Sequence, residues 1–448
     1  MCNSLKVGYA RVDITPEQYT NLGGNGQDAK RMCNKVLERI FGTCVAISDT
    51  ENNTILYCPV DLVHAKPWFS TPIREEISEV TGVPVENIMI NASHNHSGPS
   101  TSAPHLEAVK LWSEHLKKQM VKCAKEAMED RKEAELFVGQ REVPGMTFVR
   151  HYHMNDGTVA GPNSGSFASG VKDYISKADN QLQVIRFARK DARDVVLVNW
   201  QCHATSAGAG ENHLALQGEY IYAMRNHLEG LTGTYSAFFQ GAAGNLVPTT
   251  RIKGDSVVEN NVIVYGRALA EHAVACLNEN MVPVNGGPVR ATSRIFQGKV
   301  DHSDDHLAEK AQAAWDRYNE YPYEQRAEAT KQVLHPAGFN SFLHTMGIVR
   351  RSQLGETLPM PQWALCAGDI GFISAPYEMF CSNGMYIKEH SPFKMTFVVT
   401  CTNDSFDYMA DDNAFNYDLY EINTRRYGRG TAERLAENFV EMLKELKQ

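Results

Sequence analysis

Apolar residues recur at helical spacing in four segments of the chain. Thr71 and Pro72 have the residue types of an N-cap and a first helical position, and Gly82 is placed to end the helix that follows them. A second helix is predicted from about residue 104 to 130. Ser303, which two aspartates follow, is expected to begin a third, because acidic residues favour the positive end of a helix dipole. The last helix is expected to bury Leu435, Phe439, Met442 and Leu446.

Short apolar runs between these segments have the length of buried strands. Four of them lie at residues 88–90, 195–198, 371–373 and 396–399. Because strands and helices alternate, we predict an α/β fold in which mixed β-sheets are flanked by α-helices. The sequence has no internal repeat, low-complexity stretch or obvious linker, so residues 1–448 are expected to form a single domain.

Composition narrows the classes of function. The chain has 448 residues, of which 43% are hydrophobic and 22% charged, as in ordinary soluble proteins. Its net charge of −9 without a basic block argues against nucleic acid or an anionic membrane surface as partner. No apolar run approaches the roughly 18 residues of a membrane span. The N-terminus lacks a secretory signal, so we expect a cytoplasmic protein with a small-molecule substrate. No pattern indicates an oligomeric state.

Ten cysteines are scattered along the chain without a C-x-x-C pair. This spacing argues against a cysteine zinc site or a thioredoxin-like centre. In a reducing compartment most of these cysteines are expected to be buried thiols.

Polar side chains that suit a metal follow the predicted strands. The sharpest pattern is His94-x-His96, because side chains two apart in an extended segment point the same way and imidazole suits Zn²⁺, Mn²⁺ or Fe²⁺. The alternative is a pair of structural histidines, but the preceding strand and the turn at 97–99 favour a site. His203 and Glu378 follow two other strands, and neither is informative alone.

Several common catalytic motifs are absent. The sequence has no H-E-x-x-H, G-x-S-x-G, P-loop or G-x-G-x-x-G, which argues against a zincin protease, a nucleophile elbow and a nucleotide site. A second H-x-H, His151 to His153, lies beside Arg150 and is compatible with a plain loop. The Gly/Ser-rich segment 161–170 is expected to be a loop, and the loop from 157 to 170 is either a lid over the site or a flexible connection.

At these residues the sequence resembles the neutral/alkaline non-lysosomal ceramidase family, over nearly the whole chain. Segment 91–99, NASHNHSGP, resembles the family signature T-H-T-H-S-G-P and is the most specific match. The other matching segments are VGYARVDITP (7–16), NWQCHATS (199–206), FQGAAGNLVP (239–248), APYE (375–378) and the tyrosine-rich stretch 408–426. The resemblance implies a ceramidase catalytic-domain-like fold and a single metal-hydrolase domain.

The resemblance also implies a ligand set. The family binds one zinc ion through two histidines, a glutamate and a tyrosine, which fall here on His94, His203, Glu378 and Tyr408. Tyr417 and Tyr420 lie close enough in sequence to be alternatives to Tyr408. His96 falls on the family histidine that assists proton transfer, and Arg150 on an arginine that positions the substrate. Mn²⁺ or Fe²⁺ would suit the same ligands.

The sequence departs from the family at the glycine-rich turn. Val247 stands where ceramidases have a serine that was once proposed as nucleophile, and Asn245 stands where they usually have aspartate. A serine mechanism is therefore excluded at that position. The chain also shows no secretory signal and no C-terminal β-domain of the kind ceramidases carry, so ceramide is in doubt as substrate.

A zinc-dependent mechanism does not require the serine that this chain lacks. A bound Zn²⁺ lowers the pKa of its water from about 15.7 to about 7, and the hydroxide would attack an amide or ester carbonyl while His96 transfers the proton. The first hypothesis is therefore a zinc-dependent hydrolase of a small cytoplasmic substrate. The second uses the same metal site for lactone hydrolysis or C–O cleavage of a sugar-derived substrate. The third, a non-catalytic metal-binding homologue, predicts an incomplete site.

Overall fold

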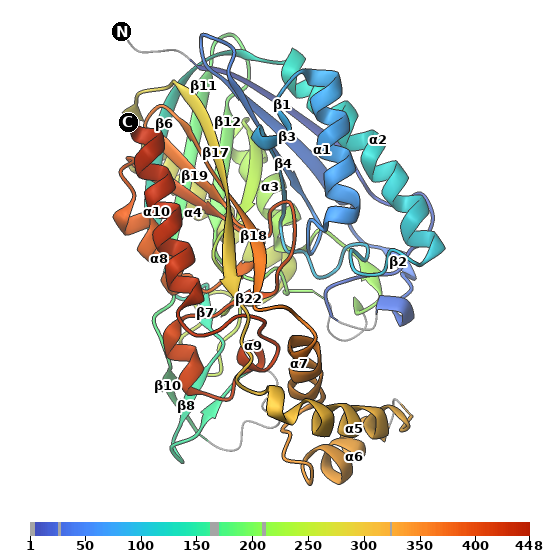
Figure 1. The fold of residues 1–448 in the computed structure, drawn as a ribbon. Coiled ribbons are helices and arrows are strands. Elements are labelled where there is room, and N and C mark those ends of the chain that lie inside the picture. Colours follow the sequence, from blue (N-terminus) through green and yellow to red (C-terminus); the bar gives the residue numbers. More distant parts are fainter. Residues whose placement is uncertain (1–4, 26–27, 162–169, 208–211, 323–324) are drawn as a thin grey trace.

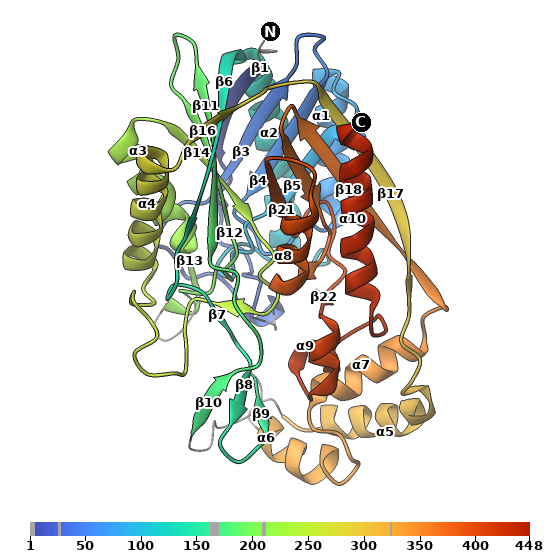
Figure 2. The same cartoon turned by 90° about the vertical axis from the view of Figure 1, so that its left-hand side faces the viewer.

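Two β-sheets packed face to face form the centre of the computed structural model, which describes residues 5–25, 28–161, 170–207, 212–322 and 325–448. Helices cover the outer face of each sheet (Figures 1 and 2). The result is a sandwich with the layer order helix, sheet, sheet, helix. This arrangement confirms the predicted α/β class with mixed sheets and flanking helices.

The larger sheet has nine strands in the order β14-β12-β11-β6-β1-β3-β4-β5, with β16 also paired to β6. Neighbours are antiparallel except for β12 with β14 and β4 with β5. The strands are β1 (Leu5–Asp13), β3 (Phe41–Ser48), β4 (Thr54–Val60), β5 (Ile88–Ala92), β6 (Lys132–Glu142), β11 (Gln181–Arg189), β12 (Val195–Trp200), β14 (Tyr235–Gln240) and β16 (Val282–Val284).

The smaller sheet has the order β17-β18-β19-β21, in which β19 and β21 are parallel. Its strands are β17 (Val289–Lys299), β18 (Thr357–Ala367), β19 (Ile370–Ser374) and β21 (Met395–Val399). The four runs predicted as buried strands are β5, β12, β19 and β21, and every residue of these strands is buried.

A cluster of four aromatic rings joins the two sheets. Tyr57 and Phe239 from the larger sheet and Phe372 and Phe397 from the smaller one contact each other around a closed circuit, with ring centroids 5.0–5.9 Å apart. The hydroxyl groups of Tyr57 and Ser374 lie 3.0 Å apart. Aromatic pairs at such distances contribute more than their buried area alone, so this core fixes one sheet against the other.

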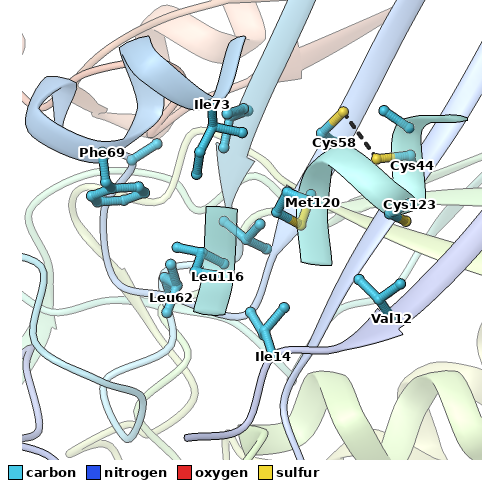
Figure 3. Close-up of a cluster of buried hydrophobic side chains, with 14 of the residues drawn as sticks. Val12, Ile14, Cys44, Cys58, Leu62, Phe69, Ile73, Leu116, Met120 and Cys123 are labelled. Carbon is cyan, nitrogen blue, oxygen red and sulfur yellow. Dashed lines mark hydrogen bonds between the residues drawn. The ribbon is translucent and has the colours of Figure 1, made fainter. Parts of the chain in front are cut away.

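The outer layers are three pairs of helices. On the larger sheet, α1 (Pro67–Thr81) and α2 (Glu107–Glu129) pack at one end, where Leu116 and Met120 meet Val12, Ile14 and three buried cysteines (Figure 3). At the other end of that sheet α3 (Glu219–Thr232) and α4 (Val262–Glu279) cover β11, β12 and β14. On the smaller sheet lie α8 (Cys381–His390) and α10 (Thr431–Lys447).

Some predicted helix boundaries are correct and others are not. Gly82 ends α1 in the left-handed conformation, as predicted, but α1 begins at Pro67, one turn before Thr71. Pro67 also fits the first helical position, and the earlier start buries Phe69. Ser303 precedes a 3₁₀ turn, so that helix α5 begins only at Ala308. Helix α10 buries the four apolar residues predicted for it.

A helical segment is inserted between β17 and β18. It contains α5 (Ala308–Asn319), α6 (Arg326–Ala329) and α7 (Phe342–Ser352), which share an apolar core of their own. In Figure 1 it lies below the sheets, beside α9 (Tyr420–Asn423). Gly347 allows α7 to approach α9, because a Cβ at this position would lie 2.1 Å from the backbone oxygen of Asn423.

Short strands complete the fold. A three-stranded sheet of β8 (Tyr152–Met154), β9 (Val159–Ala160) and β10 (Val171–Tyr174) lies near the inserted helices (Figure 2). The remaining pairs are β2 (Lys35–Val36) with β13 (Ala215–Leu216), β7 (Phe148–Val149) with β15 (Leu246–Val247), and β20 (Glu378–Met379) with β22 (Tyr408–Met409).

The cysteines and the lengths of the helices bear on two further expectations about the chain. The nine cysteines among them are all buried and unpaired, as predicted. None of the helices in these segments combines the length and the apolar character needed to cross a membrane.

The contact between α7 and α9 gives a first prediction. Gly347→Ala should lower the free energy of unfolding by about 1–3 kcal/mol, because the new methyl group has to push the Asn423 backbone away. Gly230→Ala is the matched control, since a Cβ on this residue of α3 meets nothing within 4 Å. That variant should be neutral or stabilised by up to about 1 kcal/mol. Urea denaturation measures both, and equal effects of the two substitutions would contradict the close packing of α7.

Candidate metal centre

Several strands of both sheets end at one side of the sandwich, and polar residues follow them there. In the larger sheet these polar residues follow β4, β5 and β12. In the smaller sheet they follow β19 and β21, and there they form the short strands β20 and β22. All five strands belong to parallel pairs, whose carboxyl ends point in the same direction. The side chains brought there are His64, His94, His96, His203, Glu378 and Tyr408.

Imidazoles from the larger sheet surround a carboxylate from the smaller one. Nε2 of His94 lies 3.2 Å from Oε2 of Glu378, and Nε2 of His203 lies 3.3 Å from the same oxygen. The rings of His94 and His203 are 4.6 Å apart, and the ring of His96 is 4.7 Å from that of His94. The ligand atoms of the three histidines lie within 4.8 Å of one another.

Backbone carbonyls fix the orientation of two of these rings. Nδ1 of His94 lies 2.9 Å from the carbonyl oxygen of Val63, and Nδ1 of His203 lies 2.8 Å from those of Ala243 and Leu246. A carbonyl accepts only from an N–H, so each Nδ1 carries the proton when the ring is neutral. Nε2 then keeps a lone pair that points at the centre, which is the usual arrangement of metal-bound histidine.

The atoms at the centre are buried and have no hydrogen-bond partner among the described residues. They are Nε2 of His94, His96 and His203 and Oε2 of Glu378. A buried polar atom without a partner costs free energy, and here four such atoms face one point. A cation at that point would satisfy the atoms of His94, His203 and Glu378 together, and the ring of His96 lies beside them. The donor set of imidazole nitrogens and a carboxylate oxygen fits Zn²⁺, and also Mn²⁺ or Fe²⁺.

The H-x-H motif brings its rings together in a different way from the one predicted. His94 is not extended but has a φ of 59°, in the left-handed region that non-glycine residues rarely adopt. The residue between the histidines holds this turn, because the Asn95 amide donates to the carbonyl oxygens of Asp61 and Gln217, and its oxygen accepts from the backbone N–H of Ser97. Strain of this kind is often found at functional sites.

When no cation is bound, the protonation states of Glu378 and of the neighbouring imidazoles depend strongly on one another. Burial would raise the pKa of Glu378, but the neighbouring imidazoles, His94 first, hold it well below its usual range. Burial opposes protonation of His94, yet the Glu378 carboxylate outweighs it and holds the pKa of His94 well above the ordinary value. Burial lowers the pKa of His203 to about 4 and that of His96 well below its usual range. The carboxylate therefore requires one nearby positive charge.

The tyrosines separate into two groups. Tyr408 is paired with Glu378 across β20 and β22, so that both side chains lie on the same side of this small sheet. Tyr408 and Tyr420 line the cavity in front of the imidazoles, with their rings 5.6 Å apart. Tyr417 instead contacts the ring of His153. Of the three candidates, the structure brings Tyr408 and Tyr420 to the site and places Tyr417 outside it.

Arg150 has other contacts than those expected of a residue that binds substrate. Its guanidinium donates to Glu421 over 2.7 Å and packs against the rings of Tyr408 and Tyr420. It does not line the cavity. Glu421 is fully buried and also lies 2.9 Å from Nε2 of His151. The second H-x-H is thus part of an ionic cluster and of strand β8 rather than a loop, and it does not face the metal centre.

The glycine-rich turn has a structural part in this region. The side-chain oxygen of Asn245 accepts a hydrogen bond from the backbone N–H of Cys381. The backbone carbonyl oxygen of Asn245 accepts one from the backbone N–H of Arg150. Val247 lies in β15 opposite Phe148 and does not line the cavity. Of the segment predicted as a lid, 157–170, residues 162–169 lie outside the described residues, whereas Val159 and Ala160 form β9.

Two residues near the centre, His64 and Glu421, were not predicted from the sequence. Nε2 of His64 lies 3.4 Å from Oε1 of Glu378, and His64, His94 and Glu378 form a second group of potential ligands. His64 follows the apolar run that forms β4, so the rule that identified His203 would also have found it. Glu421 gave no such signal, because its partner Arg150 is 271 residues away in the sequence.

A cavity of about 200 Å³ opens in front of the imidazoles. One wall consists of His64, His94 and His96 with Glu378 and the two tyrosines. The opposite wall comes from α7 and from residues 424–426, and it includes Leu343, Met346, Arg350, Arg351, Arg425 and Arg426.

The geometry predicts a bound metal ion. Purified protein should contain about one divalent ion per chain, measured by inductively coupled plasma mass spectrometry, and a chelator should lower its melting temperature because the ion binds only the folded chain. His94→Ala and His203→Ala should each lose most of the metal. His153→Ala is the control, since its ring pairs with Asp173 outside the centre. Wild-type protein without metal, or both site variants with full metal content, would disprove the site.

The cluster at Glu421 predicts a pH dependence of stability. Burial would raise the pKa of Glu421, but Arg150 and His151 lower it to about 2, against an ordinary value of 4.5. Because the unfolded chain binds this proton more tightly, the stabilisation is complete above about pH 5 and is lost as the pH falls toward 2. Its size is at most about 3 kcal/mol.

Glu421→Gln should therefore be less stable than wild type at pH 7, by about 3 kcal/mol, because it leaves Arg150 buried without a counter-ion. The difference should narrow between pH 5 and pH 3. Urea denaturation of chelator-treated protein measures this without a contribution from metal release. A difference that stays constant over this range would mean that Glu421 is not ionised in the folded chain.

Comparison with known proteins shows a structural likeness. No family model and no curated protein sequence matches the chain. Solved structures do match it, among them "Ceramidase complexed with C2", with a TM-score of 0.71 and 17% identity, and the neutral ceramidase from Pseudomonas aeruginosa, with a TM-score of 0.70 and 16% identity. Each match covers 99% of this chain and 75% of the other. The chain therefore has a neutral ceramidase-like fold.

Proposed function

We propose that this chain is a metal-dependent hydrolase that cleaves an amide or ester bond of a small molecule, and that residues 1–448 act as one catalytic domain. The observation that carries the proposal is the set of buried, unpartnered atoms on His94, His96, His203 and Glu378 that face one point. The fold supports the reaction class, because the two similar solved structures are named as ceramidases.

In this proposal His94, His203, Glu378 and Tyr408 hold the metal, which is Zn²⁺ by preference. A divalent cation there supplies Lewis acidity toward a carbonyl oxygen and lowers the pKa of a water molecule. The chain supplies the orientation. The carbonyl oxygens of Val63, Ala243 and Leu246 hold the two imidazoles, and backbone pairing holds Tyr408 beside Glu378.

His96 is proposed as the group that moves the proton. Its ring is half-buried, lines the cavity and faces the imidazoles of His94 and His203. Gly24 packs directly over it, at a position where a Cβ would lie 2.7 Å from the Cα of His96. Such acid–base assistance typically contributes about 10²–10⁴-fold in rate.

Arg150 is proposed to act through Tyr408 rather than on the substrate. Its guanidinium lies 5.2 Å from the centre of the Tyr408 ring, and its ion pair with Glu421 keeps it there. Asn245 and Val247 lie behind this layer, so the absence of the family serine does not change the lining of the cavity.

A second candidate reaction uses the same centre for lactone hydrolysis or C–O cleavage of a sugar-derived substrate. The size and lining of the cavity favour it as an alternative to a lipid substrate. About 200 Å³ is below the range of roughly 300–1,000 Å³ typical of pockets for drug-sized ligands, and much of the lining is charged. A non-catalytic homologue is disfavoured because His94 and His203 lie against Glu378, and Tyr408 is paired beside it.

A substrate screen with a paired variant tests the proposal. Metal-loaded protein should hydrolyse members of a panel of N-acyl compounds and simple esters, and the second candidate predicts turnover of sugar lactones instead. His96→Ala should keep its metal and lose about 10²–10⁴-fold in kcat. If this variant loses the metal, His96 is a ligand rather than the proton carrier. If the wild-type protein with full metal content turns over neither class, the hydrolase proposal fails.

A further inference from the structure

We propose that the substrate of this centre carries a carboxylate, which Arg350 binds across the cavity from the metal. The inference rests on the proposed function, since it concerns the same site. It begins from the uneven distribution of charge. The chain as a whole has a net charge of −9, yet four arginines line this one cavity, at positions 350, 351, 425 and 426, against two carboxylates, Glu378 and Asp407.

Three of these arginines are neutralised by the protein itself. Arg425 pairs with Asp301 over 2.5 Å and with Asp304 over 3.0 Å, and Arg351 shares Asp304 over 2.9 Å. Arg426 pairs with Asp407 over 2.6 Å. The first group is a network of two arginines and two aspartates, and the second is a simple pair. Neither leaves a charge for a ligand.

Arg350 is different. It lies in the last turn of α7, is exposed and lines the cavity, and among the described residues no carboxylate lies within ion-pair distance of it. An arginine in the last turn of a helix would also be stabilised by the negative end of the helix dipole. That interaction does not require a position on the wall of a cavity.

The protein holds this part of α7 firmly. Gly347 packs against the Asn423 backbone, and the buried guanidinium of Arg351 donates to the carbonyl oxygen of Arg425 and to Asp304. Both contacts are within one turn of Arg350. A binding group that is positioned in advance loses less entropy when a ligand binds. The contacts of α7 therefore favour Arg350 as one side of a two-point site, with the metal ligands as the other.

The size of the cavity agrees with a short anionic substrate. A volume of about 200 Å³ is small for long alkyl chains, and among the described residues the aliphatic side chains of the lining are those of Val63, Leu343 and Met346. One uncompensated guanidinium matches one carboxylate, which it can bind through two parallel hydrogen bonds. A short N-acyl amino acid combines the two features, with an amide for the metal centre and a carboxylate for Arg350.

The test uses a panel of N-acetylated amino acids and their uncharged methylamides. Isothermal titration calorimetry on metal-loaded wild-type protein should show that the acids bind about tenfold more tightly than the methylamides. The preference should weaken at high ionic strength, because Arg350 is exposed. Arg350→Gln should abolish the preference and leave binding of the methylamides unchanged, which also shows that the variant is folded.

Arg317→Gln is the matched control. Arg317 lies in the last turn of α5, is exposed like Arg350 and does not line the cavity, so this variant should keep the wild-type preference. Equal binding of acids and methylamides by wild type, absence of binding of both, or a preference that survives Arg350→Gln would overturn the inference. The titration reports binding, and hydrolysis of the same compounds is assayed separately, so a preference in protein that hydrolyses nothing would refute the hydrolase proposal alone.

Discussion

The buried carboxylate of Glu378 is the group on which the site depends. It is 8% exposed and lies against the imidazoles of His64, His94 and His203, so it needs a positive charge close by. In the chain without metal, the coupling between Glu378 and His94 supplies that charge as a proton. A divalent cation at the same point would replace it. The left-handed turn at His94 and the carbonyl anchors of the rings all serve to keep Nε2 atoms around this carboxylate.

The two sheets contribute different parts of the centre. The histidines follow strands of the larger sheet, and Glu378 and Tyr408 follow strands of the smaller one. The ligands can therefore meet only if the sheets keep their relative position. The ring cluster of Tyr57, Phe239, Phe372 and Phe397 provides this constraint, because it packs directly between the sheets. A largely apolar contact between the sheets thus determines the geometry of a polar site.

The strand patterns explain how much of this could be predicted. Short apolar runs followed by polar residues identified β5, β12, β19 and β21, and His94, His203 and Glu378 follow three of these strands. The H-x-H pattern was interpreted on a wrong premise, since His94 is in a left-handed turn and not in an extended strand. A local pattern records which residues are polar, but the path of the backbone between them depends on contacts such as those of Asn95.

Other features depend on contacts between distant segments and gave no local signal. The pairing of Arg150 with Glu421 is one, and it changed the expected role of Arg150. The docking of α7 is another. Its helical pattern says nothing about which wall it will form, because that is decided by Gly347 against Asn423 and by the arginine network around Asp304.

The two walls of the cavity are formed by different parts of the fold. The wall with the proposed metal ligands is built on the sheets, which belong to the fold that this chain shares with the ceramidase structures at 16–17% identity. The opposite wall is built on α7, in a helical segment inserted between β17 and β18. Substitutions in α7 can therefore change which molecule fits the cavity without moving any proposed ligand. Likeness at this identity shows the fold alone, and the choice of substrate depends on the inserted wall, where Arg350 is the arginine of α7 without an ion-pair partner among the described residues.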